Sequence, residues 1–169
     1  FTYPFRKVEG ILKTADVVFA NLESPISDRG VPVDGKPITL RSGTKAFEAI
    51  RAAGFNLLNL ANNHVMDYGD EALYDTLDIL DGNGIAFAGA GRNIEEARKA
   101  AILEKNGYKI GMLAYTDMAY IRFGGPESYA AASSTKPGVA PLDGLMIKED
   151  IGKLKGKVDI LIVSLHWGT

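Results

Sequence analysis

The side chains best suited to chemistry in this chain of 169 residues form a polar cluster directly after a short apolar run. The run, residues 55–61, has the length and composition of a β-strand. The cluster combines two amides, an imidazole and a carboxylate, from Asn62, Asn63, His64 and Asp67. Polar groups at the carboxyl end of a strand lie at the rim of a sheet, where open α/β sheets bind their ligands. The sequence therefore predicts a functional site at this rim.

Two other apolar runs end in the same way. Residues 16–22 lead to Glu23, shortly after the amide of Asn21, and residues 158–165 lead to His166, the second of two histidines in the chain. If the three strands lie parallel in one sheet, their polar ends meet at one edge. Carboxylate, amide oxygen and imidazole together suit a borderline divalent ion such as Mn²⁺, Fe²⁺ or Zn²⁺. The same groups also suit general acid–base catalysis.

Each of these residues has a structural interpretation as well. A single histidine after a strand is more often a hydrogen-bonded structural residue, and Glu23 is equally compatible with a solvated position. Asn62 and Asn63 are typical of turns with left-handed backbone, and Asp67 is typical of a helix N-terminus. Trp167 could line a pocket or fill the core, and the sequence favours neither. The functional interpretation depends on both histidines and an acid falling at three separate strand ends.

Other motifs and the composition of the chain give weaker evidence about function, and most of it excludes a class of protein. The pair Gly89-x-Gly91 lacks the third glycine of the dinucleotide fingerprint, so a nucleotide-binding domain is disfavoured. No Gly-x-Ser-x-Gly elbow surrounds Ser164, which excludes a serine hydrolase of that type. The chain has no cysteine and therefore no thiolate chemistry. A net charge of −2 argues against nucleic acid as a partner, and no apolar run approaches the roughly 20 residues of a membrane helix.

The expected elements alternate between helices and strands, which predicts an α/β sandwich. Helices are expected over residues 4–14, 44–53, 70–81, 94–99 and 143–154. Strands are expected over residues 16–22, 38–41, 55–61, 85–88, 101–105, 108–115 and 158–165, and those at 16–22 and 158–165 are expected to be buried. Asn106-Gly107 predicts a tight hairpin, and residues 26–36 and 116–136 are expected to be irregular.

Four segments, spread along nearly the whole chain, carry recognisable motifs: residues 16–25, 59–69, 89–93 and 162–168. In this order they resemble the bacterial poly-gamma-glutamate capsule biosynthesis family of the CapA type. Asn-Asn-His-x-x-Asp-x-Gly and His-Trp-Gly are the specific elements, whereas Gly-x-Gly is common. That family is similar to the calcineurin-like metallophosphoesterases. The resemblance implies a metallo-dependent phosphatase-like α/β/β/α sandwich with mixed sheets around a two-metal site.

The resemblance also implies a role for each candidate residue. Asn63 and His166 resemble metal-binding residues, and Glu23 stands where the superfamily has a metal-bridging aspartate. His64 resembles the catalytic histidine that gives a proton or hydrogen bond to the leaving oxygen. Asp67 would orient His64, from three residues further on. The remaining residues expected to line the site are Asn21, Asn62 and Trp167.

Two elements of the family pattern are absent from the sequence. They are a strand ending in Gly-Asp before the first residue, and a Gly-His-x-Pro-His type element after His-Trp-Gly. We therefore expect residues 1–169 to be a single CapA-like metallophosphatase-type domain truncated at both ends. This fragment is expected to bind metal poorly and to be inactive, whereas the intact protein would hold two divalent ions (Mn, Fe or Zn).

Two hypotheses for function follow from the resemblance. The first is a capsule biosynthesis protein with a metal-dependent hydrolase or phosphoesterase site. The second is a non-catalytic capsule-assembly protein that binds or exports anionic poly-glutamate. The implied partners are poly-gamma-glutamate, or another anionic substrate, and a capsule synthesis membrane complex. The implied location is the bacterial cell surface or membrane, with no anchor in this chain.

Overall fold

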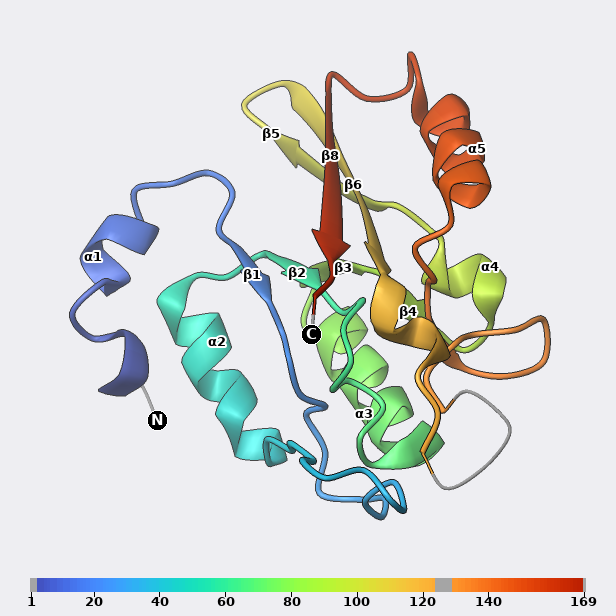
Figure 1. Ribbon diagram of the computed structural model, residues 1–169. Coiled ribbons are helices and arrows are strands. Elements are labelled where there is room, and N and C mark those ends of the chain that lie inside the picture. Colours follow the sequence, from blue (N-terminus) through green and yellow to red (C-terminus); the bar gives the residue numbers. More distant parts are fainter. Residues whose placement is uncertain (1–2, 124–128, 169) are drawn as a thin grey trace.

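The computed structural model describes residues 3–123 and 129–168 (Figure 1). Its α-helices are α1 (Glu9–Leu12), α2 (Phe47–Ala53), α3 (Gly69–Gly82), α4 (Ile94–Ala97) and α5 (Gly144–Leu154), and its 3₁₀ helices are η1 (Tyr3–Phe5), η2 (Thr44–Ala46) and η3 (Asp117–Tyr120). Its strands are β1 (Phe19–Asn21), β2 (Leu57–Asn59), β3 (Ala86–Ala88), β4 (Ala90–Gly91), β5 (Ala101–Lys105), β6 (Tyr108–Thr116), β7 (Gly138–Val139) and β8 (Ile160–His166). The mixed α/β architecture predicted from the sequence is confirmed.

The strands of the described residues form two three-stranded sheets and a small ribbon. The first sheet is parallel, in the order β1-β2-β3. The second has the order β5-β6-β8, with β5 antiparallel and β8 parallel to β6. Strands β4 and β7 pair antiparallel. The three polar-ended strands do not share one sheet, which was the condition under which the sequence predicted that their ends meet at one edge, because the β5–β6 hairpin starts a second sheet and β8 joins that one.

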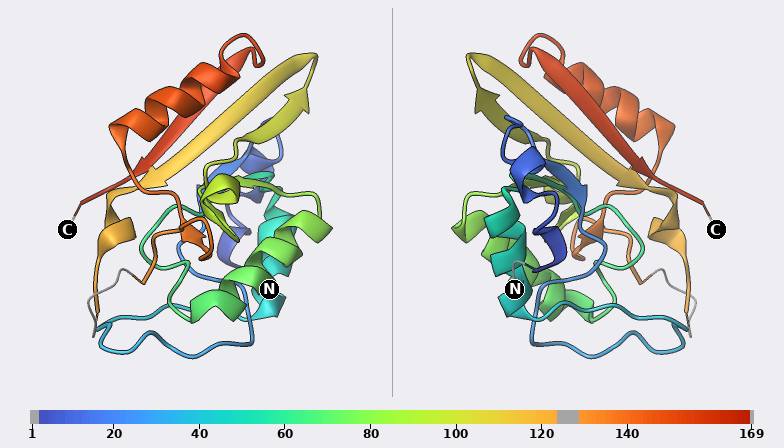
Figure 2. Two further views of the ribbon diagram at one scale, coloured as in Figure 1. Left: turned by 90° about the vertical axis from the view of Figure 1, so that its right-hand side faces the viewer. Right: turned by 90° about the vertical axis from the view of Figure 1, so that its left-hand side faces the viewer.

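Three apolar clusters show how the sheets and helices are layered. One lies between the first sheet and helices α2 and α3. A second lies between the two sheets, and a third lies between the second sheet and helix α5. Successive residues of a strand alternate between clusters, as in β6, where Met112 faces the other sheet and Leu113 faces α5. The result is helices, sheet, sheet and helix in succession (Figure 2), which confirms the predicted α/β sandwich.

Strands β1 and β8 are each at one edge of their sheet, although the sequence predicted that both are buried. Phe19 and Leu165 are exposed, and most of β8 is only partly buried. An apolar composition predicts a strand but does not tell an edge from a centre, because the edge is set by which strands pair. The consequence for the site is that two of its three strands are open on one side.

The structure agrees with the sequence prediction at turns and helix ends where one or two residues determine the backbone conformation. Asn106 and Gly107 both have positive φ, 51° and 82°, as the tight β5–β6 hairpin requires. Asp143 accepts hydrogen bonds from the amides of Leu145 and Met146 and so caps α5. The strand expected at 38–41 is wrong, since only Ser42 forms a bridge, with Ile26. Residues 124–128 of the irregular segment predicted at 116–136 lie outside the described residues.

Gly89 lies at a position where any side chain is expected to destabilise the protein. Its φ is +97°, and a Cβ added there would lie 2.5 Å from the Cβ of Ala61 and 2.9 Å from that of Ala114. Gly89→Ala is therefore expected to lower the free energy of unfolding by about 2–4 kcal/mol through overpacking and left-handed strain. Gly82→Ala is the control, because nothing lies within 4 Å of its added Cβ. Equal urea midpoints for the two variants would contradict this prediction.

Candidate functional site

Asn62 fixes the turn that follows β2. Its side-chain oxygen accepts hydrogen bonds from the amides of His64 and Val65, both at 3.0 Å. Its side-chain nitrogen donates to the carbonyl of Leu22 at 2.9 Å and to Asn21 Oδ1 at 3.1 Å. The side chain is completely buried and all of its polar atoms are used. Asn62 therefore ties the end of β2 to the end of β1 and is a structural member of the site.

Glu23, Asn63 and His166 converge, each from the end of a different strand. Nε2 of His166 lies 3.0 Å from Oδ1 of Asn63 and 3.7 Å from Oε1 of Glu23. The other carboxylate oxygen of Glu23 accepts a hydrogen bond from the Asn21 amide at 3.2 Å. The two sheets thus bring together three groups that the sequence analysis singled out, even though they do not share a sheet.

His64 and Asp67 form a second contact next to the first. Nδ1 of His64 lies 2.6 Å from Oδ2 of Asp67, so Nδ1 carries a proton and donates it to the carboxylate. The same carboxylate oxygen accepts the amide of Leu40 at 2.7 Å. Asp67 is fully buried and precedes the first turn of α3, so the helix N-terminal interpretation of this residue was wrong.

Lys36 and Tyr129 complete the surroundings of Asp67, and neither was singled out from the sequence. The Lys36 ammonium donates to Asp67 Oδ1, to the backbone carbonyl of Asn63 at 2.5 Å and to the Tyr129 hydroxyl at 2.9 Å. Tyr129 in turn donates to the Asn63 carbonyl. Burial, and next the Asp67 charge, raise the pKa of the Tyr129 hydroxyl well above its ordinary value, so it stays a donor.

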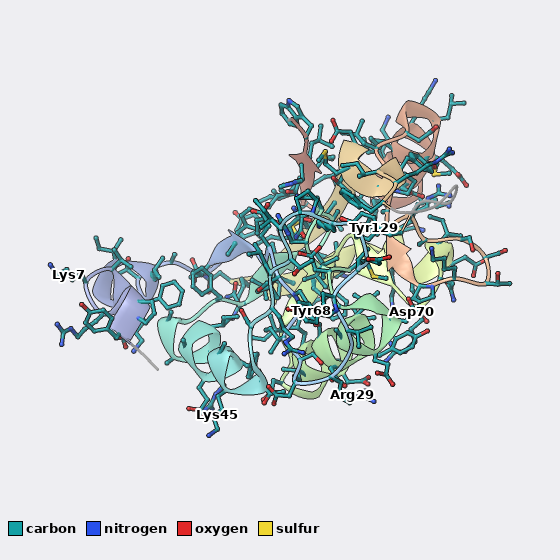
Figure 3. All side chains as sticks on the ribbon, turned by 60° about the horizontal axis from the view of Figure 1, so that its bottom comes forward. Lys7, Arg29, Lys45, Tyr68, Asp70 and Tyr129 are labelled. Carbon is teal, nitrogen blue, oxygen red and sulfur yellow. The ribbon has the colours of Figure 1, made fainter. Side chains whose placement is uncertain are left out.

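No pattern in the sequence indicated these two residues, because each comes from an irregular segment far from the motif. Tyr129 lies 66 positions and Lys36 lies 27 positions from Asn63. In Figure 3 the side chain of Tyr129 lies among the crowded side chains near the middle of the molecule, whereas Lys7 and Lys45 extend from its rim. A buried lysine of this kind is recognised only when the fold is known.

The remaining candidates are placed as follows. Trp167 is 68% exposed, so it does not fill the core. The φ angles of Asn62 and Asn63 are negative, since Asn106 is the one residue other than glycine with positive φ in the described chain; the left-handed turn interpretation was wrong. The Gly89-x-Gly91 pair allows close packing, because a Cβ on Gly91 would lie 2.4 Å from Glu96 Cβ. Asn93, two residues further on, caps α4.

The donor set of Glu23, Asn63 and His166 fits a divalent ion in chemistry. It offers a carboxylate oxygen, an amide oxygen and an imidazole nitrogen, a mixture suited to Mn²⁺, Fe²⁺ or Zn²⁺. Three protein ligands with an open position are typical of catalytic zinc sites. Within residues 3–123 and 129–168, no three His, Asp or Glu side chains are grouped so that they could hold a metal. The donor set described above contains only one His and one Glu, and its remaining donor is the amide oxygen of Asn63.

The described part of the chain contains no helix that is long and apolar enough to cross a membrane.

Comparison with known proteins gives consistent matches along the chain. The model of the family described as "Bacterial capsule synthesis protein PGA_cap" matches residues 1–169. "Capsule biosynthesis protein CapA" of Bacillus anthracis is 31% identical over 173 residues, which cover 98% of this chain and 40% of that protein. "PGA biosynthesis protein CapA" of Bacillus subtilis is 32% identical over 166 residues, or 97% of this chain and 42% of that protein.

A third relative comes from Mycobacterium tuberculosis. "Probable polyglutamine synthesis accessory protein Rv0574c" is 31% identical over 176 residues, covering 99% of this chain and 46% of that protein. The chain therefore spans between 40% and 46% of the length of these curated relatives.

Proposed function

Because this chain belongs to the bacterial capsule synthesis protein family PGA_cap, we propose that it acts in poly-gamma-glutamate capsule synthesis through a metal-dependent hydrolase site. The relatives are named for capsule, PGA or polyglutamine synthesis, and these names support the process and an association with the cell envelope. The hydrolase chemistry rests on one observation. From three strand ends, the His166 imidazole lies within 3.7 Å of both the Glu23 carboxylate and the Asn63 amide oxygen, beside the His64–Asp67 pair.

The roles in this proposal follow from the positions of the side chains. Glu23, Asn63 and His166 would hold a divalent ion such as Mn²⁺, Fe²⁺ or Zn²⁺. When bound, such an ion supplies Lewis-acid polarisation and a water of lowered pKa. Nδ1 of His64 is committed to Asp67, so the imidazolium form of His64, which the carboxylate stabilises, would hold a second proton on Nε2 and give it to the leaving oxygen. The substrate class is an anionic phosphoester or γ-glutamyl amide.

A second ion is part of the proposal for the protein at its natural length. The chain spans less than half of its curated relatives, and the three donors described above suffice for one ion. Further ligands for a second ion would come from outside the 169 residues.

A non-catalytic role is the second candidate, and the name of one relative favours it. The mycobacterial relative is called an accessory protein of synthesis, which names no reaction. In this alternative the site binds or exports anionic poly-glutamate, beside a capsule synthesis complex at the membrane.

The discriminating experiment uses the protein at the length at which its cell produces it. Metal content is measured by elemental analysis, and turnover is assayed with Mn²⁺ on p-nitrophenyl phosphate, bis-p-nitrophenyl phosphate and short γ-glutamyl peptides. The hydrolase proposal expects bound metal and turnover of at least one of the three substrates. Absence of metal together with absence of turnover would leave only the binding role, which is then measured with poly-gamma-glutamate itself.

His166→Ala is the matching ligand test. Loss of the imidazole is expected to weaken Mn²⁺ binding at least about 100-fold, because outer-shell changes alone cost about 10–100-fold. Titration calorimetry of the metal-free protein measures this. The control is Ile160→Ala, an exposed residue at the opposite end of β8, which is expected to leave Mn²⁺ affinity within about twofold of wild type. Equal Mn²⁺ affinities for His166→Ala and wild type would remove His166 from the ligand set.

A further inference from the structure

Lys36 presents a buried positive charge next to the candidate site. Its side chain is only 5% exposed, and that of its ion-pair partner Asp67 is 0% exposed. Lysine is almost never buried without a partner. An ammonium group has three N–H donors, and here three oxygens accept them: Asp67 Oδ1, the Asn63 carbonyl and the Tyr129 hydroxyl. The group is therefore saturated, and no donor is left for a substrate.

The chain makes a long detour to bring Lys36 to this place. The loop of residues 26–42 is closed at its base, where Ile26 and Ser42 form a bridge and the amide of Ser27 donates to the Ser42 carbonyl at 2.9 Å. Further along, the amide of Val33 donates to the Asp67 carbonyl at 2.9 Å. The loop is thus held at its base and again at Asp67. Lys36 lies in sequence between Val33 and Leu40, whose amides both donate to Asp67.

The ammonium contacts both halves of the site. Through the Asn63 carbonyl it holds the backbone of the residue whose side chain meets His166. Through Asp67 it holds the carboxylate that receives the His64 proton. Nδ1 of His64 itself lies 3.5 Å from the ammonium, but its proton is already directed to Asp67. The rings of Phe123 and Tyr129 lie 5.8 Å and 4.9 Å from the ammonium and help to seal it from water.

We propose that Lys36 is the positioning residue of this site, whose buried ammonium sets the directions of the Asn63 side chain and the His64 ring at once. Without it, Asp67 is a buried carboxylate that lacks its counter-ion, and such a group turns toward water or opens its surroundings. His64 then loses the acceptor that selects its tautomer. The inference deepens the proposed function, and only its kinetic readout rests on that function.

The first test needs no activity. His64 and His166 are labelled with ¹⁵N in wild type and in Lys36→Met, and their ring nitrogens are recorded at one pH, about two units above the ordinary histidine pKa. In wild type, His64 is expected to show a single tautomer with the proton on Nδ1. In Lys36→Met its two nitrogens are expected to move toward the average of both tautomers, and those of His166 are expected to shift as well, because His166 Nε2 contacts the Asn63 side chain.

The matched control removes a largely buried ion pair outside the site. Arg98, directly after α4, donates to both oxygens of Asp150 in α5, each at 2.8 Å. Arg98→Met should destabilise the protein and leave the His64 nitrogens as in wild type. Unchanged His64 nitrogens in folded Lys36→Met would overturn the proposal. Lys36→Gln, which keeps a donor but no charge, is expected to behave like Lys36→Met. Unfolding of both would likewise overturn it, since Lys36 would then support the fold as a whole.

The kinetic readout separates positioning from substrate binding. If the protein turns over one of the substrates named above, Lys36→Met is expected to lower kcat about 10- to 100-fold, with KM within about twofold of wild type. A rise in KM with kcat unchanged would overturn the positioning role. Failure of the wild-type protein to bind Mn²⁺ or to turn over any substrate would reject the proposed function, and the NMR comparison would still decide the role of Lys36.

Discussion

Asp67→Ala is expected to lower the free energy of unfolding by about 3–5 kcal/mol, because it leaves the Lys36 ammonium buried without a counter-ion. Asp67 has no exposed surface and accepts from Lys36, His64 and the Leu40 amide. The substitution therefore removes two contacts that join the loop of residues 26–42 to the turn after β2, and it also removes the acceptor of the His64 proton. Urea denaturation followed by circular dichroism measures the loss.

The control for this substitution is Asp70→Ala. Asp70 is an exposed acid in the first turn of α3, and losing its interaction with the helix dipole is expected to cost about 0.3–1 kcal/mol. A double variant, Asp67→Ala with Lys36→Met, is expected to recover part of the loss, because no charge is then left buried. Asp67→Ala as stable as Asp70→Ala would show that the ion pair adds nothing to the fold.

His64→Gln is expected to lower turnover by about 10²–10⁴-fold, the usual contribution of a positioned general acid. Its effect on stability should be small by comparison with that of Asp67→Ala, because the His64 backbone amide keeps its bond to Asn62. Mn²⁺ affinity should stay close to wild type, because His64 is not among the three converging donors. Steady-state kinetics and calorimetry on the same preparation measure both quantities.

Substitutions of the two histidines are thus predicted to have opposite effects on metal binding and on activity. His166→Ala should lose metal first and activity as a consequence, whereas His64→Gln should lose activity with the metal retained. A His64→Gln variant that lost Mn²⁺ as strongly as His166→Ala would contradict the division of roles between them. Full activity in His64→Gln would exclude it as the group that serves the leaving oxygen.

Much of the site was predictable because its residues lie at the ends of recognisable strands. Glu23, Asn63 and His166 each follow an apolar run, and a strand end is a rim position wherever the strand lies in its sheet. The His64–Asp67 contact was predicted through the family resemblance and is short-range, spanning three residues. Local turn chemistry was equally informative at Asn106-Gly107 and at Asp143, since a single residue controls the backbone there.

The rest depended on contacts between parts of the chain that are distant in sequence. The sequence does not say that β8 pairs with β6 and not with β1 or β2, because strand pairing is decided by packing of whole faces. It does not mark β1 and β8 as edge strands, since apolar edge and centre strands have similar compositions. Nor does it mark Lys36, which has no pattern around it and becomes a buried ion-pair partner only when its loop folds back on Asp67.

Local patterns in the chain were therefore enough to predict the α/β class, the strand ends and the candidate side chains of the site, because each depends on a few neighbouring residues. The meeting of these side chains across two sheets, and the burial of one lysine beneath them, arose from long-range packing. Free energies of burial and charge pairing act between segments that no short stretch of sequence contains.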